Sequence, residues 1–262
     1  MNISESTENV VVTYEGRMVT IMLNRPNVLN ALDVPTIKEL LRVFQVVANS
    51  NADVVVLCGM GRGFSAGGDI KSMLAELDES KFDPIINQIS ELVLTLYTMP
   101  KLVLAAIHGP TAGLGLSLAL AADYVLADAS SLIAMNFIGI GLIPDGGGHF
   151  FLKQRVGENA AKQIIWEGKR MTAAEALQIG MIDEVAQEDF QETVKKKVGS
   201  WLKKPVQTML QTKHIFTELH KATLQQVLAF EKEGQMRMRK TKDHAEGIRA
   251  FLEKRPPSFT GK

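Results

Sequence analysis

The chain contains few residues of some types and no excess of either charge, and each of these features excludes some classes of protein. Its 262 residues contain a single cysteine, Cys58, so no disulfide can form within the chain. That usage is typical of the reducing cytoplasm. Neither sign of charge is in excess, because 29 Lys and Arg residues balance 29 Asp and Glu residues. Proteins that bind nucleic acid usually carry a basic surplus, so nucleic acid is not expected as a partner.

No segment has the pattern of a membrane anchor. The N-terminus is polar and acidic and lacks the basic and apolar regions of a signal peptide. Residues 102–122 carry no Asp, Glu, Lys or Arg and are long enough to span a bilayer. His108, Gly109 and Pro110 interrupt them, so we predict a buried strand, a turn and a buried helix. We therefore expect a cytoplasmic protein without membrane contact.

Apolar runs of two kinds alternate along the first two thirds of the chain. Short β-branched runs predict strands, and runs with apolar residues every three or four positions predict helices. The near-continuous apolar strands favour a sheet that is covered on both faces. Expected strands are 10–13, 19–23, 53–59, 102–107, 124–127 and 132–135, and expected helices are 34–49, 70–77, 84–98, 113–122 and 146–156. Strand and helix recur in a ββα-like rhythm.

The remainder of the chain has helical periodicity alone. From residue 159 onwards five segments place apolar residues at three- and four-residue spacing. Thr172 and Glu175 form a capping-box pattern at the start of one of them. We predict a catalytic core over residues 1–200 and a helical C-terminal region over residues 201–262.

Two glycine-rich turns follow buried strands and lead directly into helices. They read "FSAGGD" (64–69) and "HGPTAGLG" (108–115). Amides at such turns lack backbone partners and carry positive potential. If the two turns converge, their amides would form an oxyanion hole; alternatively, the glycines merely permit tight connections. Neither turn has the spacing of a dinucleotide-binding fingerprint. The sequence also shows no cluster with metal-ligand spacing, so no metal is expected.

A lone carboxylate stands in the segment "IGLIPDGGG" (140–148). Asp145 is the first charged residue after Asp128 and lies between Pro144 and three glycines. Apolar neighbours such as Phe137 and Leu142 could desolvate the carboxyl group and raise its pKa toward neutrality, as a proton-transferring acid requires. The alternative is that Asp145 caps the helix that follows. The residues alone leave both interpretations open.

Five segments together resemble a known family. They are "LNRPNVLNAL" (23–32), "GRGFSAGGDI" (61–70), "AAIHGPTAGLGLSLALAAD" (105–123), "IGLIPDGGG" (140–148) and "EGIRAFLEKRPPSFTGK" (246–262). Their order and spacing resemble the enoyl-CoA hydratase/isomerase family of the crotonase superfamily, over nearly the whole chain. The resemblance implies an α/β (α+β) fold, a spiral of ββα units with a C-terminal helical trimerisation region. It also implies homotrimers or hexamers, and a coenzyme A thioester as substrate without a permanently bound cofactor.

The resemblance also assigns residues. It implies that the amides of Ala66 and Leu114 hold the thioester oxygen as it becomes an enolate. Basic residues near the chain ends are expected to meet the nucleotide phosphates, and the first glycine turn to meet the adenine or pantetheine arm. The expected coenzyme A contacts are Arg25, Ser65, Ala66, Gly67, Gly68, Asp69, Ile70 and Lys262. The segment 70–77, with Met73, Leu74 and Leu77, is a candidate wall of the acyl pocket.

Two departures from the family pattern bear on the reaction. Hydratases of this family position water with two glutamates, and Ser117 and Phe137 occupy those positions here. Asp145 instead matches an aspartate of members that shift double bonds, including dienoyl-CoA isomerases and the ring-opening isomerase of phenylacetate degradation. The resemblance therefore favours an isomerase in which Asp145 shuttles a proton, and His108 and His149 are read as structural. Three alternatives stay open: a hydratase with a rearranged site, an Asp145 nucleophile as in coenzyme A dehalogenases, and an inactive acyl-CoA-binding homologue.

Overall fold

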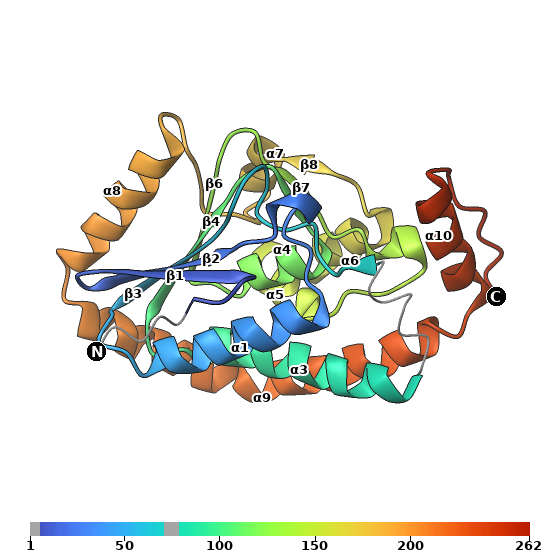
Figure 1. Cartoon of the computed structure of the whole chain (residues 1–262), viewed down its shortest axis with the longest axis horizontal. Helices are drawn as coiled ribbons and strands as arrows, with labels where there is room; N and C mark the ends of the chain where they lie inside the picture. Colours follow the sequence, from blue (N-terminus) through green and yellow to red (C-terminus); the bar gives the residue numbers. More distant parts are fainter. Residues whose placement is uncertain (1–5, 71–78) are drawn as a thin grey trace.

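A six-stranded sheet forms the centre of the computed structural model, which describes residues 6–70 and 79–262 (Figure 1). Its strand order is β1-β2-β3-β4-β6-β9. The hairpin β1–β2 is antiparallel, and the other neighbours pair in parallel. The strands are β1 (Val10–Glu15), β2 (Met18–Leu23), β3 (Val54–Gly59), β4 (Leu102–Ile107), β6 (Tyr124–Ala127) and β9 (Glu184–Val185).

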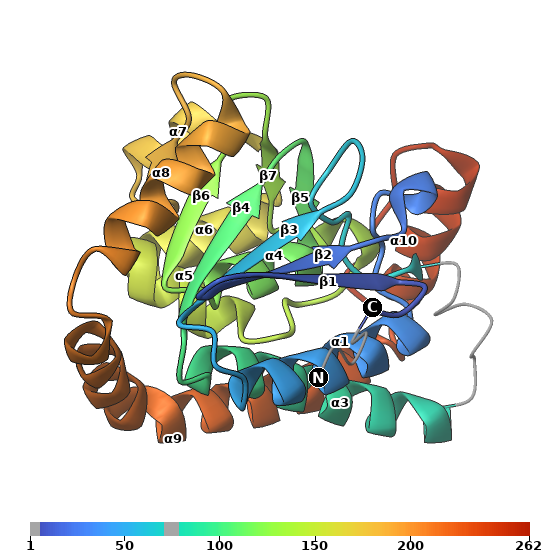
Figure 2. The same cartoon turned by 60° about the vertical axis from the view of Figure 1, so that its left-hand side comes forward.

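Both faces of the sheet are buried, as the apolar strands predicted. Side chains alternate along a strand, so Val55 and Leu57 enter one apolar cluster while Val54 and Val56 enter another. The larger cluster lies under α1 (Val34–Ala48), α3 (Glu79–Thr98), α4 (Gly113–Leu120), α5 (Gly148–Val156) and α9 (Val206–Met238). The smaller one lies under α8 (Phe190–Leu202). Figure 2 shows α1, α3 and α9 side by side beneath the sheet.

A second, three-stranded sheet continues from the first. Its order is β5 (Pro110–Ala112), β7 (Leu132–Ala134) and β8 (Met171–Thr172). Residues 108–109 join β4 directly to β5, and the chain then enters α4. The predicted strand, turn and helix over 102–122 are thereby confirmed. No helix in the described part of the chain is both long and apolar enough to cross a bilayer.

Several boundaries differ from the sequence prediction. Helix α3 begins at Glu79 and includes Pro84, although the polar segment before Pro84 indicated a break. Helix α5 begins at Gly148, because Gly146 and Gly147 adopt φ values of 62° and 76° that a right-handed helix excludes. Two predicted C-terminal helices are one, α9, of 33 residues, since no glycine or proline interrupts them before Gly234.

Two elements near Asp145 were not predicted from the sequence. They are the 3₁₀ turn η2 (Phe137–Ile140) and α10 (Lys242–Glu253). The two pack together, and His244 Nδ1 lies 2.8 Å from the Ile140 carbonyl oxygen. The last residues fold back on α10, where the Asp243 carboxylate accepts the amides of Thr260 and Gly261. The remaining helices are η1 (Pro26–Val28), α6 (Glu158–Glu167) and α7 (Ala173–Gln178), and α7 carries the predicted capping box.

Candidate active site

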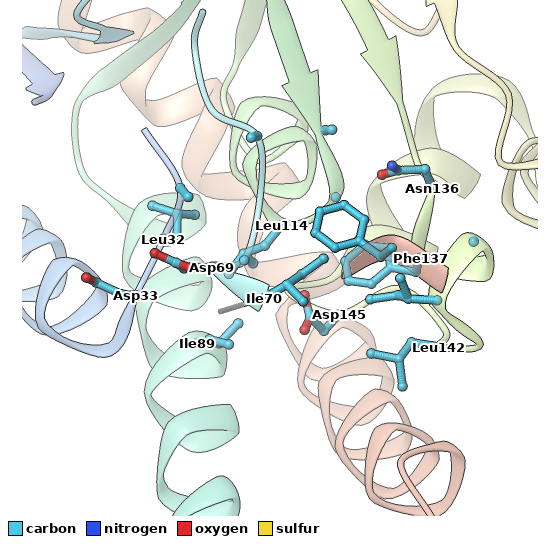
Figure 3. A pocket seen from close by; sticks show the side chains of 18 of the residues that line it. Leu32, Asp33, Asp69, Ile70, Ile89, Leu114, Asn136, Phe137, Leu142 and Asp145 are labelled. Atoms are coloured by element: carbon cyan, nitrogen blue, oxygen red, sulfur yellow. The ribbon is translucent and has the colours of Figure 1, made fainter. Parts of the chain in front are cut away.

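A cavity of about 620 Å³ opens between the two glycine turns, α3 and η2. Most of its wall is apolar and includes Ile86, Ile89, Phe137 and Leu142. Figure 3 shows the Asp145 side chain among Ile89, Phe137 and Leu142, near Leu114 and Ile70. The turns predicted to converge therefore do so, and they converge on Asp145.

The two turns are in direct backbone contact. Ser65 donates its amide to the Pro110 carbonyl oxygen at 3.2 Å, and Ala112 donates to the Ser65 carbonyl oxygen at 2.9 Å. Gly67 has φ 93°, and a β-carbon there would lie 2.8 Å from the Ala112 carbonyl oxygen. Position 67 thus accepts only glycine, both for its backbone conformation and for the close approach of the second turn.

The amides that are free at the two turns differ from those expected to form an oxyanion hole. The Ala66 amide donates to the Leu29 carbonyl oxygen at 2.9 Å, so it is occupied and the expectation for Ala66 is wrong. The amides of Gly68 and Leu114 make no hydrogen bond among the described residues, and both residues line the cavity. Leu114 is the second residue of α4, where backbone amides lack helical partners. The positive φ of Gly67 turns the chain between Ala66 and Gly68, which the sequence motif does not reveal.

Arg25 is held by two carboxylates. Its Nη2 lies 2.9 Å from Asp33 Oδ2, and its Nη1 lies 3.2 Å from Asp69 Oδ2. Nη1 also donates to the Ala31 carbonyl oxygen at 2.5 Å. These contacts fasten the first glycine turn to the N-terminus of α1. A role of Arg25 in coenzyme binding remains a prediction, and its guanidinium already has two anionic partners.

The other expected coenzyme contacts fall into three groups. Ala66, Gly68, Asp69 and Ile70 line the cavity, while Ser65 is buried and donates its hydroxyl to the Asn30 carbonyl oxygen at 2.8 Å. Lys262 ends the folded-back tail and does not line the cavity. The candidate pocket residues Met73, Leu74 and Leu77 lie outside the described residues.

Asp145 does not cap the helix that follows it. Its Oδ1 is buried without a hydrogen-bond partner among the described residues, and the α5 N-cap is Gly147. Its carbonyl oxygen, by contrast, is tied down, because the Ser117 hydroxyl donates to it at 2.8 Å and the Gly148 amide at 3.1 Å. Because Gly147 occupies the N-cap position and no N-cap side chain binds the amides of α5, the cap interpretation is wrong.

The surroundings of Asp145 disfavour its charged form. Burial, and secondarily the negative charge of Glu231, raise the pKa of the Asp145 carboxyl to about 8. The other cavity carboxylates, Asp33 and Asp69, are paired with Arg25. Of the cavity-lining carboxylates that the structure describes, Asp145 is thus the one without a cationic partner.

Glu231 is a site residue that the sequence reasoning missed. It comes from α9, is 3% exposed, and accepts the amides of Gly147 and His149 at 2.7 and 3.1 Å. His149 Nδ1 lies 2.7 Å from Glu231 Oε1. A signal was present, because Glu231 shares its helix face with the buried Leu224 and Leu228. A carboxylate on an apolar stripe requires a buried partner.

The remaining candidate residues, Phe137, His108 and Cys58, have structural surroundings that explain their presence. The Phe137 ring lies over the second turn, since a β-carbon on Gly113 would be 3.7 Å from it. His108 Nε2 lies 2.9 Å from the Gly61 carbonyl oxygen, in agreement with its structural interpretation. Burial raises the pKa of the Cys58 thiol to about 12, so it is no ready nucleophile. Among the described residues, no three His, Cys, Asp or Glu side chains are placed to hold a metal ion.

This arrangement can be compared with known proteins. The model of the enoyl-CoA hydratase/isomerase family matches residues 13–262. The chain belongs to this family. YhaR of Bacillus subtilis, provisionally named an enoyl-CoA hydratase/isomerase, is 48% identical over 96% of this chain and 99% of its own length. The trans-2-decenoyl-[acyl-carrier-protein] isomerase of Streptococcus mutans is 30% identical over 97% of this chain and 99% of its own.

Solved structures support the crotonase fold. The crystal structure of an enoyl-CoA hydratase from Mycobacterium avium subsp. paratuberculosis superposes with a TM-score of 0.88. It is 33% identical and covers 97% of this chain and 100% of its own. The predicted fold class is confirmed. The names of these relatives include both hydratases and isomerases.

The raised pKa of Asp145 predicts how the stability of the protein depends on pH. The unfolded chain ionises Asp145 near pH 4, whereas the folded protein keeps it neutral up to about pH 8. Folding is therefore progressively disfavoured as pH rises from about 4 to 8. We expect Asp145→Asn to stabilise the protein relative to the parent, by a difference that grows over this range to a few kcal/mol at most, on the order set by such shifts.

Thermal unfolding at several pH values measures this difference. Asp189→Asn is the matched control, because Asp189 does accept a helix amide, that of Glu192 at 2.9 Å. It should show no stabilisation that grows with pH. A destabilised Asp145→Asn variant at pH 8 would contradict the assignment of a raised pKa.

Proposed function

We propose that the protein is an acyl-thioester double-bond isomerase in which Asp145 shuttles the proton. The observation that carries this proposal is the buried Asp145 Oδ1 in an apolar cavity, without a hydrogen-bond partner among the described residues, together with the Gly68 and Leu114 amides of the same cavity, which also make no hydrogen bond there. An acid whose pKa lies near the working pH can both accept and donate a proton, which this reaction requires of one residue.

The reaction would proceed in two proton transfers. The Asp145 carboxylate takes a proton from a carbon of the acyl chain, and the electron pair delocalises onto the thioester oxygen. The amides of Gly68 and Leu114 donate hydrogen bonds to that oxyanion; such a donor is typically worth about 2.7–4 kcal/mol of barrier. The Asp145 carboxylic acid then returns the proton two carbons away. The product differs from the substrate in the position of the double bond and in nothing else.

Coenzyme A is proposed as part of the substrate, with no permanently bound cofactor. The Streptococcus mutans relative is named for an acyl-carrier-protein substrate, so the same chemistry can serve another thioester carrier. The cavity volume and apolar wall suit a linear or cyclic acyl chain. An assay with 3-enoyl-CoA and 2-enoyl-CoA substrates addresses the carrier and the reaction together.

Hydration is the second candidate, because a hydratase of solved structure is among the relatives. It would need a group to activate water beside Asp145. Ser117 is engaged with the Asp145 carbonyl oxygen and Phe137 has no ionisable group. Isomerisation needs no second acid and is therefore favoured.

The isomerase assignment makes a prediction about turnover. Asp145→Asn should retain the fold and acyl-CoA affinity but lower isomerase kcat by at least about 10²-fold, the scale for loss of a general base. The parent should hydrate 2-enoyl-CoA weakly. Product analysis by mass and double-bond position, with circular dichroism as a control for folding, measures both. Normal isomerisation by the variant, or efficient hydration by the parent, would refute the proposal.

The tail makes a prediction about coenzyme binding. Arg255 is neutralised by Glu246, with Nη2 3.0 Å from Oε2, whereas Lys262 has no ion pair among the described residues. Lys262→Ala removes the ammonium group and leaves the backbone bonds to Asp243 intact. We expect weaker acyl-CoA binding at low salt and a smaller difference at high salt. Lys204→Ala, just beyond α8 at the other end of the molecule, is the control (Figure 1). Equal affinity of the parent and Lys262→Ala would refute the contact.

Assembly into trimers or hexamers is proposed on the exposed apolar side chains of α9. They are Ile215, Phe216, Leu219 and Phe230. Exposed apolar patches of this kind mark protein contacts. Sedimentation should give a trimer or a multiple of it, and Leu219→Asp should dissociate it, whereas Gln163→Asp on α6 should not. A parent that is a monomer at micromolar concentration would exclude the assembly.

A further inference from the structure

We propose that Glu231 is the positioning residue of Asp145: by occupying the amides at the start of α5, it denies them to Asp145 and sets the basicity of that carboxyl group. Its relevance to catalysis rests on the proposed function, whereas the titration of Asp145 can be measured whether or not the protein is an isomerase. It concerns a residue behind the cavity wall, since Glu231 itself does not line the cavity.

First, Glu231 and Asp145 compete for the backbone amides at the start of α5. A helix start offers free amides and positive potential, and an aspartate side chain can accept the amide two residues further along, which for Asp145 is that of Gly147. Here the Glu231 carboxylate accepts from Gly147 at 2.7 Å and from His149 at 3.1 Å. Among the described residues, Asp145 Oδ1 is left buried and without a partner. An anion at Asp145 therefore lacks the stabilisation that its place in the sequence suggests.

The second step is the clamp that holds the loop in this arrangement. Gln235 lies one turn beyond Glu231 on the same face of α9, and its Nε2 donates to the Ile143 carbonyl oxygen at 2.5 Å. Gln235 and Glu231 of α9 thus bind the backbone before and after Asp145. Ser117 holds the Asp145 carbonyl oxygen from α4. These hydrogen bonds fix the backbone on both sides of Asp145, while Glu231 occupies the amides.

The third step is electrostatic. Glu231 is 3% exposed and its charge acts on Asp145 through a poorly screening interior, which disfavours a second anion. Among the described residues, the other ionisable groups of the cavity wall are Asp33 and Asp69, which are paired with Arg25, and Arg170 and Arg239. His149 lies against Glu231 with its side chain 36% exposed, and on α3 Asp83 is paired with Lys232 at 2.7 Å. Arg239, two turns further along α9, stacks on the Phe82 ring.

The test measures the ionisation of Asp145 directly. The infrared carbonyl band of the neutral carboxyl group, identified by its loss in Asp145→Asn, is followed against pH. Glu231→Gln keeps an acceptor for the Gly147 amide and removes the charge. We expect it to lower the midpoint of the Asp145 titration by about one pH unit, the order of a single nearby charge. In the isomerase assay the acidic limb of kcat/KM should move by the same amount, with KM nearly unchanged.

Gln235→Leu is the matched control, because it breaks the clamp without altering charge. It should lower the unfolding temperature but leave the midpoint in place, because Glu231 still occupies the amides and keeps its charge. His149→Lys places a permanent cation beside Glu231 at a partly exposed position and should lower the midpoint as Glu231→Gln does, which keeps the test available if the latter folds poorly. An unchanged or raised midpoint in Glu231→Gln or His149→Lys would overturn the inference. A shifted midpoint in a protein that isomerises nothing would uphold it and refute only the proposed function.

Discussion

One carboxyl oxygen, Asp145 Oδ1, is buried in an apolar cavity without a hydrogen-bond partner among the described residues, and the site depends on this constraint. A buried oxygen without a donor is unfavourable, and an aspartate can instead accept the amide two residues further along the chain. The loop around Asp145 is therefore held from two sides. Ser117 of α4 binds its carbonyl oxygen, and Gln235 and Glu231 of α9 bind the residues before and after it.

The two glycine turns depend on equally close contacts. The first turn is fastened to α1 by the ion pairs of Arg25 and to the second turn by the Ser65 and Ala112 hydrogen bonds. Within the described part of the chain, these contacts leave the Gly68 and Leu114 amides without hydrogen-bond partners. Unoccupied donors and an unoccupied acid each cost stability, by about 1–3 kcal/mol for a buried polar group. The apolar clusters on both faces of the sheet offset this cost, so the fold tolerates a site that is locally unfavourable.

The sequence predicted the parts that depend on local pattern. Strand alternation, the two glycine turns, Asp145 and its apolar neighbours are all contiguous in the chain, and the structure places them as expected. It could not predict that Glu231, 86 positions after Asp145 in the numbering, competes for the same amides, because that contact depends on how α9 packs. The mistaken choice of Ala66 has a different cause. A motif gives the order of residues, but the direction of an amide follows from the φ of Gly67.

Ser117 and Phe137 occupy the two positions that matter most for the choice between hydration and isomerisation. Where hydration would require two carboxylates around a water molecule, one position here supplies a hydroxyl that fixes the loop and the other an aromatic ring over the second turn. Neither side chain adds a charge beside Asp145, and Ser117 also holds its backbone. The proposed isomerisation needs only one acid and two free amides, whereas hydration would also need a group that activates water. The burial that raises the pKa of Asp145 suits it to the proposed proton transfer.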